Sequence, residues 1–287
     1  MSSEQPSASG LQLSLDALAL ARTGRAYDLS SGWWPGMPLS EGHPPFQVLT
    51  YRSPGGERNQ GDVGFLRDNP LNVGWISELL MCTMHTGTHI DALAHTTCGP
   101  DAAWHGGHSS YTELGDFGPL NSDASELAPI VTRGVSLDIP GALGVDQLAA
   151  SQPVGAPELE AACQRQRTEP GRGDVALVRT GTMRHWPDAS RLPHGAGLSL
   201  DGALWLADRG VVAVGADNVA LEVDPSGRPG DPQPVHRTLI FERGIPILEW
   251  VYQEELARDS VSEFLFVCLP LTVKGATGSL VRPLAIT

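Results

Sequence analysis

The segment Met84–His95, with the sequence MHTGTHIDALAH, decides how the chain is interpreted. It contains three of the nine histidines of the chain and one aspartate, namely His85, His89, Asp91 and His95. Imidazole and carboxylate groups are common protein ligands of zinc and manganese. The segment is therefore a candidate metal site, and the alternative is a set of core or surface histidines that cluster by chance.

The spacing of these residues limits how they can cooperate. Four fully extended residues span roughly 13 Å, so His85 and His89 can share an ion only if the backbone curls. Gly87 lies between them and allows such a curl. Asp91 and His95 are also four residues apart, which a helical turn brings onto one face. We predict a curled entry and then a short helix, with His85, His89 and Asp91 as ligands and His95 placed for proton transfer.

Composition excludes several classes of protein. The chain has 287 residues, 41% of them hydrophobic, and can bury a substantial core. Its net charge of -14 disfavours nucleic acid and anionic membranes as partners. The start MSSEQPSASG lacks the features of a secretory signal, and no uncharged apolar run is long enough to span a membrane. We therefore expect a cytoplasmic protein.

The four cysteines are scattered and form no C-x-x-C pair, which fits reduced thiols. Cys82 and Cys98 flank the histidine motif. They are either additional metal ligands or bystander thiols, and the second interpretation is favoured.

The rest of the chain predicts an α/β layered fold. A polar stretch, residues 1–10, precedes a short helix expected at residues 14–22. We then expect strands at 130–139, with an Arg-Gly interruption, and at 174–180, 211–215, 245–249 and 264–269, and helices at 157–167, 199–209 and 235–243. No linker or internal repeat is visible. We predict an N-terminal tail with a short helix, residues 1–27, and a single domain, residues 28–287.

Several loops contain candidate substrate-binding residues. Trp33 and Trp34 lie in a Gly/Pro-rich loop, where they either cover an aromatic substrate or pack on the body or on a partner. His105 and His108 follow the motif and either line the pocket or are exposed. The Thr88 hydroxyl could orient a ligand. Residues 53–74 predict a long excursion with little regular structure, which is typical of a lid or a subunit contact.

The pattern H-x-G-T-H-x-D-x-x-x-H resembles the signature of the putative cyclase family, which includes bacterial kynurenine formamidase and isatin hydrolase. The stretches RGVSLDI, LVRTGTMRHW and HRTLIFERGIPILEW are also similar to that family, and the resemblance runs from about Asp28 onward. The chain departs from the pattern at Leu93, where many members have proline, and at Thr96, where they have an aromatic residue. These departures concern the pocket wall and therefore the substrate more than the metal.

The resemblance implies a swivelling β/β/α fold, a homodimer or homotetramer, and one or two divalent ions, zinc or manganese. By position, His85, His89 and Asp91 match ligands of the first metal, and His95 matches the acid/base histidine. His236 and Glu249 match ligands of a second metal, although a structural salt bridge would also explain them. Asp217 matches the acid at the end of the central strand.

Together these features predict a metal-dependent hydrolase of a small aromatic amide, lactam or lactone, similar to arylformamidases and cyclic amidases. The chain has no G-x-S-x-G elbow, so a serine nucleophile is not indicated. One alternative is a cyclase that acts on an aromatic polyketide intermediate. Another is a non-catalytic protein that binds a metal or a ligand.

Overall fold

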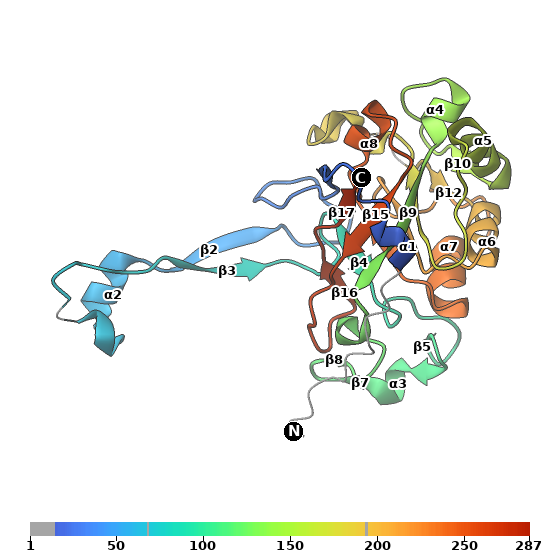
Figure 1. The fold of residues 1–287 in the computed structure, drawn as a ribbon. Helices are drawn as coiled ribbons and strands as arrows, with labels where there is room; N and C mark the ends of the chain where they lie inside the picture. Colours follow the sequence, from blue (N-terminus) through green and yellow to red (C-terminus); the bar gives the residue numbers. More distant parts are fainter. Residues whose placement is uncertain (1–14, 68, 193–194) are drawn as a thin grey trace.

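The structure of the protein is a computed structural model, and it describes residues 15–67, 69–192 and 195–287. A nine-stranded mixed sheet with helices against it forms the body, and a long arm projects from that body (Figure 1). The predicted α/β class and the single body are confirmed. Residues 1–10 and Ser14, for which we predicted a tail and a helix N-cap, lie outside the described residues.

The helices are short. The α-helices are α1 (Leu15–Leu18), α2 (Pro54–Gln60), α3 (Ser110–Glu113), α4 (Ile139–Leu143), α5 (Ala156–Gln166), α6 (Leu200–Asp208), α7 (Pro234–His236) and α8 (Glu254–Arg258). Single 3-10 turns are η1 (Gly64–Leu66), η2 (Ala124–Glu126), η3 (Thr182–His185) and η4 (Ala189–Arg191), and η5 (Arg237–Glu242) is a π-helix. Among the described residues, none of these helices has the length and apolar character needed to cross a bilayer.

The strands of the large sheet follow the order β1-β17-β15-β9-β11-β13-β14-β4-β16. Their bounds are β1 (Ala26–Asp28), β4 (His89–Asp91), β9 (Ile130–Asp138), β11 (Val175–Arg179), β13 (Ala213–Ala216), β14 (Ile247–Glu249), β15 (Glu263–Cys268), β16 (Gly278–Leu280) and β17 (Leu284–Ile286). Small two-stranded ribbons pair β2 (Gln47–Arg52) with β3 (Ser77–Met81), β5 (Ala103–Trp104) with β6 (His108–Ser109), β7 (Leu114–Gly115) with β8 (Gly118–Pro119), and β10 (Pro153–Val154) with β12 (Gly197–Leu198).

Strands β9, β11, β13 and β14 are mutually parallel, and the remaining neighbours in the large sheet are antiparallel. The five strands predicted between residues 130 and 269 are confirmed as β9, β11, β13, β14 and β15, and the three predicted helices as α5, α6 and the α7–η5 segment, all with slightly shifted ends. The interruption expected at Arg133–Gly134 is wrong, because β9 pairs with β15 across both residues. Gly134 is required there for packing, since a Cβ atom would lie 2.3 Å from the Phe264 ring.

Two apolar cores lie on opposite faces of the sheet. In β11, Val175 and Leu177 face one core, and Ala176 and Val178 face the other. Helices α5 and α6 contribute to the core that contains Ala176, and α8 and β1 contribute to the core that contains Leu177. This alternation is that of strands covered on both faces. The sheet is therefore the rigid frame that holds the site.

Antiparallel pairing joins the histidine motif to the end of this frame. Strand β4 lies between β14 and β16, with Glu249 directly opposite His89 and Gly278 directly opposite Asp91. Residues opposite each other in neighbouring strands point to the same face. The pairing thus brings Glu249 beside a histidine that lies 160 positions earlier in the sequence.

The arm, residues 47–81, is the hairpin β2–β3 extended by α2 and η1 at its far end (Figure 1). The expectation of little regular structure in residues 53–74 is wrong. Ser53 caps α2, because its hydroxyl accepts a hydrogen bond from the Gly56 amide, and Gly61 ends the helix with φ of 59°. The chain then returns along β3, which leads directly into the histidine motif.

Candidate metal centre

The backbone between His85 and His89 curls as predicted. Gly87 has φ of 58°, and a Cβ atom on it would lie within 3 Å of Ser31 Oγ, Met37 Cε and Trp33 Nε1. Both the conformation and the crowding therefore require glycine. The loop folds tightly, with the two imidazole ring centroids 5.2 Å apart.

The short helix predicted after this curl is wrong. His89–Asp91 is strand β4, and the chain then turns, with the His95 amide donating to the Ala92 carbonyl at 3.0 Å. Pairing with β14 and β16 outweighs the local helical spacing. Since side chains two apart in a strand share a face, His89 and Asp91 still point the same way, and Ile90 enters the core.

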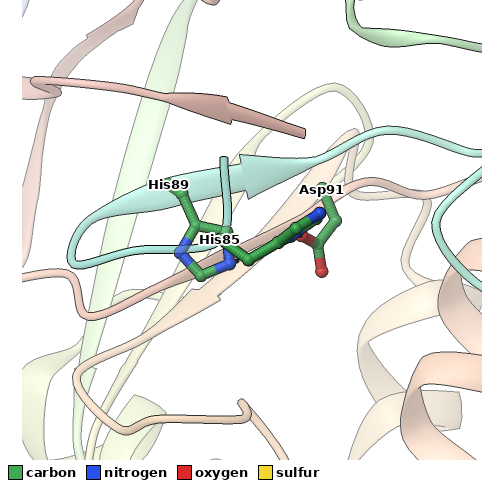
Figure 2. A group of neighbouring side chains, drawn as sticks. All are labelled: His85, His89 and Asp91. Atoms are coloured by element: carbon green, nitrogen blue, oxygen red, sulfur yellow. Dashed lines mark hydrogen bonds and ion pairs between the residues drawn. The ribbon is translucent and has the colours of Figure 1, made fainter. Parts of the chain in front are cut away.

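The first ligand group comprises His85, His89 and Asp91, each of which offers one ligand atom within 4.8 Å of the others. Figure 2 shows their side chains converging from the loop and from β4. His85 Nδ1 lies 2.7 Å from Asp91 Oδ1, and His89 Nε2 lies 3.4 Å from the same oxygen. His89 Nδ1 is 2.7 Å from the Gly87 carbonyl, to which it donates as N–H, and Nε2 is then free to bind a metal.

The second group comprises Asp91, His236 and Glu249, again within 4.8 Å. His236 Nε2 lies 3.3 Å from Glu249 Oε1, and Glu249 Oε2 lies 3.5 Å from His89 Nε2. Two ligand atoms about 2.1 Å from one ion at a tetrahedral angle lie roughly 3.4 Å apart, so these separations suit a shared ion. Asp91 belongs to both groups.

One unpaired oxygen tests whether the site fits a cation. Asp91 Oδ2 is buried and has no hydrogen-bond partner among the described residues. A buried carboxylate oxygen without a donor is costly, and a cation removes that cost. Since the surrounding donors are imidazole and carboxylate, the residues fit zinc or manganese. A divalent ion would be held by His85, His89 and Asp91, with His236 and Glu249 able to hold a second.

Two of the buried histidines hold protons that a cation would have to displace. Burial alone would lower the pKa of His89, but its hydrogen bond to Asp91 and the charges of Asp91 and Glu249 raise it to about 9. Burial likewise opposes the charge of His236, but hydrogen bonds to Glu222 and Glu249 raise its pKa to about 10. In the metal-free protein, protons on these imidazoles balance the buried carboxylates.

His95 differs from the ligands in position and charge. Its Nε2 lies 3.8 Å from Asp91 Oδ2, and its side chain is 32% exposed whereas that of Asp91 is 1% exposed. Burial, together with neighbouring histidines and against the opposing charge of Asp91, lowers the pKa of His95 to about 4. The imidazole is therefore neutral near pH 7 and lies on the solvent side of the buried carboxylate.

Sequence reasoning missed the residues that hold the ligands in place. Glu222 is buried and accepts hydrogen bonds from His236 Nδ1 and from the amides of Val235 and His236. Thr277 Oγ1 lies 2.9 Å from His85 Nε2. These contacts join segments that no local motif relates. The acidic residue 14 positions before His236 was the only available signal, and such a spacing is unspecific.

The Thr88 side chain, predicted to orient a ligand, holds the motif loop on the body. It is fully buried, its hydroxyl donates to the Trp250 carbonyl at 2.5 Å, and it accepts from the Ser31 amide at 2.6 Å. These two hydrogen bonds join the motif loop to the segments around Ser31 and Trp250.

The two loop tryptophans pack on the body. Trp33 Nε1 donates to the Thr86 carbonyl at 2.7 Å, and Trp34 makes an edge contact with Trp186 at 5.6 Å between ring centroids. Both remain half-buried. Trp33 thus lies directly against the motif loop, and Trp34 packs on Trp186. Leu93, which we assigned to the pocket wall, is half-buried and packs against the apolar core that contains Ala176.

His105 and His108 belong to neither ligand group among the described residues. His105 Nδ1 lies 2.8 Å from the Phe241 carbonyl, in the π-helix that follows His236. His108 Nδ1 lies 2.8 Å from Glu113 Oε2. Each imidazole thus has a hydrogen-bond partner outside the two ligand groups.

Asp217 and the cysteines also lie outside the two groups, within the part of the chain that the structure describes. Asp217 follows β13 and is buried beneath the loop after β11, where it accepts hydrogen bonds from the amides of Thr180 and Gly181. Cys82 and Cys98 are half-buried free thiols, so the bystander interpretation fits them.

Comparison with known proteins assigns the family. The sequence profile of the family described as Putative cyclase matches residues 27–223, more than half of the chain. The chain belongs to this family. The matched segment of this cyclase-family protein includes His85, His89, Asp91, His95 and Glu222, and ends before His236 and Glu249. No curated protein sequence matches the chain significantly.

Solved structures resemble the cyclase-family protein along most of their length. A crystal structure described as a novel cyclase is 24% identical, with a TM-score of 0.80, and covers 95% of this chain and 90% of its own. Isatin hydrolase A from Ralstonia solanacearum is 21% identical, with a TM-score of 0.67 and coverage of 96% and 98%. A potential metal-dependent hydrolase with cyclase activity is 19% identical, with a TM-score of 0.57 and coverage of 91% and 98%. At these identities the likenesses establish the fold.

Proposed function

We propose that this cyclase-family protein is a metal-dependent hydrolase of a small aromatic amide, lactam or lactone. The observation that carries the proposal is Asp91, a buried carboxylate shared by both ligand groups, with the neutral His95 Nε2 at 3.8 Å. A divalent ion held by these residues would supply a Lewis acid for a carbonyl oxygen and lower the pKa of water.

His95 is the residue placed to move the proton. As a water oxygen attacks the carbonyl carbon, His95 Nε2 accepts the proton of that water, and it returns the proton to nitrogen or oxygen when the C–N or C–O bond breaks. The lowered pKa keeps this imidazole unprotonated at neutral pH. Asp91 Oδ2 faces the same nitrogen and stabilises the imidazolium that forms between the two steps.

The immediate surroundings support an aromatic substrate. The rings of His85 and His95 are stacked, and Trp33 lies against the motif loop with part of its side chain exposed. Flat aromatic groups of this kind suit a planar ring. Resemblance of the fold to an isatin hydrolase is consistent with a small cyclic amide.

The cyclase alternative has one observation in its favour, because a structural neighbour is described as having cyclase activity. Ring closure would use the same Lewis acid and the same His95, but would add no water to the product. The non-catalytic alternative does not account for a neutral imidazole beside the buried carboxylate, since a binding site alone needs no proton acceptor.

Proton release by the full chain reconstituted with zinc or manganese tests the proposal. N-formyl anilines, isatin-like lactams and aryl lactones each give a carboxylate and a neutral leaving group, so each turnover releases one proton at mildly alkaline pH. Running the reaction in oxygen-18 water adds a direct label of hydrolysis. We expect acid release that a chelator abolishes, with one labelled oxygen in the product.

Two results would contradict hydrolysis. Turnover without oxygen-18 in the product would favour cyclisation. Acid release that continues at full rate after complete removal of the metal would separate the activity from this site. Measuring bound metal before each assay ensures that a silent panel reflects the substrates offered and not an empty site.

A further inference from the structure

The loop of residues 31–46, which connects β1 to the arm, is tied to the histidine motif. Ser31 Oγ accepts a hydrogen bond from the Thr88 amide at 2.9 Å. Trp33 Nε1 donates to the Thr86 carbonyl at 2.7 Å. The loop is therefore held against the backbone that carries the metal ligands.

His43, in the same loop, makes a third contact with the motif segment. Its Nδ1 lies 2.8 Å from Thr83 Oγ1. Its ring centroid lies 6.2 Å from that of His85, and the two ring planes are inclined by 46°. The spacing of the motif gives no reason to select His43, because it belongs to a different segment of the chain. The tertiary structure thus adds a further imidazole beside the metal centre.

His43 is arranged like a ligand histidine but lies outside both ligand groups. In His89 and His236, Nδ1 is held by an acceptor of the protein, and Nε2 lies near Glu249 in the metal centre. His43 Nδ1 is held in the same way, and its Nε2 has no hydrogen-bond partner among the described residues. Within that part of the chain, neither ligand group includes His43. Its Nε2 is therefore available to a molecule bound beside an ion rather than to the ion itself.

The ring of His43 lies within the electrostatic field of the metal centre. Burial lowers the pKa of His43, and the neighbouring His85 and His89 lower it further, against the charges of Glu249 and Asp91. The imidazole is therefore neutral at pH 7 and carries a single N–H group. The side chain is only half-buried, so a molecule from solvent can reach it.

The contact with Thr83 also determines what Nε2 can do. Thr83 Oγ1 lies 3.2 Å from Thr86 Oγ1, so Thr86 can donate to Thr83 and Thr83 to His43 Nδ1. With the hydroxyls in that direction, the ring hydrogen lies on Nε2, which becomes a donor. Carbonyl oxygens of an aromatic amide, lactam or lactone are acceptors and match this tautomer.

We propose that His43 is a specificity-determining residue: its Nε2–H donates a hydrogen bond to a second acceptor oxygen of the substrate, separate from the carbonyl that is cleaved. The inference rests on the proposed function and adds to it the class of aromatic substrates with an acyl or keto group beside the scissile group. An adjacent position fits because the rings of His43 and His85 are only 6.2 Å apart. His95 moves the proton, and His43 orients the ring.

Equilibrium binding to the full chain loaded with zinc tests the proposal without turnover. The two probes are 2-acetylbenzoate and 2-isopropylbenzoate, which are similar in size and differ in one acceptor oxygen. Titration calorimetry measures both dissociation constants. We expect wild type to bind 2-acetylbenzoate about five- to tenfold more tightly, as one added hydrogen bond allows.

Two substitutions separate the outward nitrogen of His43 from its contact with Thr83. His43→Asn keeps an amide near the position of Nδ1 and removes the outward group, so the preference should disappear. His43→Gln places an amide nitrogen near the position of Nε2, so part of the preference should return. His185→Asn is the control, because His185 is also half-buried, contacts Arg191 and lies in neither ligand group described. Metal content should be unchanged in all three variants.

Several outcomes would overturn the role of His43. They are a metal-loaded wild type that binds neither probe or binds both equally, a preference that persists in His43→Asn, and loss of metal from that variant. Failure of the proposed hydrolysis would look different. A preference that depends on His43, in a protein that adds no oxygen-18 to any substrate, would reject hydrolysis and keep the binding role. Labelled product together with equal binding of the two probes would do the reverse.

Discussion

The imidazole of His95 stacks on that of His85, with ring centroids 4.0 Å apart and planes inclined by 26°. His85 is itself held between Asp91 Oδ1 at 2.7 Å and Thr277 Oγ1 at 2.9 Å. The stacking therefore restrains the ring of His95, the proposed proton carrier, against an imidazole that is held by hydrogen bonds on both ring nitrogens. His95 sits beside the metal ligands without being one of the atoms that converge on either ligand group.

Replacing His95 with alanine should separate metal binding from turnover. We expect His95→Ala to retain the wild-type metal content, because the ligands of both groups are intact, and to lose turnover by roughly 100-fold or more. Metal analysis of the purified protein and the proton-release assay measure the two properties. A His95→Ala variant with wild-type turnover would remove this residue from the mechanism.

Glu222 should control the affinity of the second ligand group. The Glu222 carboxylate accepts from His236 Nδ1 and from two backbone amides, so it sets the orientation of the His236 ring. We expect Glu222→Gln to weaken metal binding at that group by about 10- to 100-fold. Titration with a competing chelator measures the change. Glu160→Gln is the control, because Glu160 is exposed and accepts a hydrogen bond from Trp205 Nε1. Equal affinities for the two variants would contradict the role of Glu222.

Metal binding should become stronger as pH rises. The pKa values of His89 and His236 are raised to about 9 and about 10, so both imidazoles carry a proton at pH 7 in the metal-free protein. A metal ion must displace these protons, and its affinity should rise by up to about tenfold per proton for each pH unit until the pH passes these values. Calorimetry at pH 7 in buffers of different ionisation enthalpy counts the released protons. Binding without proton release at pH 7 would show that neither imidazole is a ligand or that neither is protonated.

Asp217 should stabilise the fold without acting in the site. It is fully buried and accepts from the amides of Thr180 and Gly181 and from the Thr180 hydroxyl. An asparagine offers one acceptor oxygen in place of two, so one buried donor is left unpaired in Asp217→Asn. We expect the free energy of unfolding to fall by about 1–3 kcal/mol in chemical denaturation at pH 7.

The control for this substitution is Asp208→Asn, because Asp208 lies in an exposed ion pair with Arg243. That change should stay within about 0.5 kcal/mol of wild type. Metal content should be unchanged in both variants, since neither aspartate belongs to a ligand group. Loss of metal in a folded Asp217→Asn protein would instead connect the carboxylate with the site.

The local sequence pattern was sufficient to predict those elements whose conformation depends on a single continuous segment. The alternation of apolar strands with capped helices predicted the α/β body, and helix α5 appeared within one residue of the range expected from its proline, acids and arginines. The close spacing of His85, His89 and Asp91 likewise predicted one ligand group, because a curl of the backbone at Gly87 is enough to bring their side chains together.

The local sequence pattern gave wrong predictions where strand pairing between distant segments sets the backbone conformation. Spacing by four predicted a helix from Asp91 to His95, but β14 and β16 hold the segment as a strand. The Thr88 hydroxyl donates to the Trp250 carbonyl and accepts from the Ser31 amide, two contacts with distant segments that local pattern did not predict. The expected loop at residues 53–74 contains helix α2 on an exposed arm.

The sequence by itself determined the layered fold, the family and the histidine–aspartate group, since each depends on residues that are close along the chain. Only the tertiary structure decided that Glu249 lies opposite His89, that Glu222 orients His236, and that His95 stands beside Asp91 Oδ2. The first two relations join residues through strand pairing and burial, which leave no regular spacing in the sequence because the chain that separates the partners can be of any length. Asp91 and His95 are four residues apart, and there the structure supplied the turn that replaces the predicted helix.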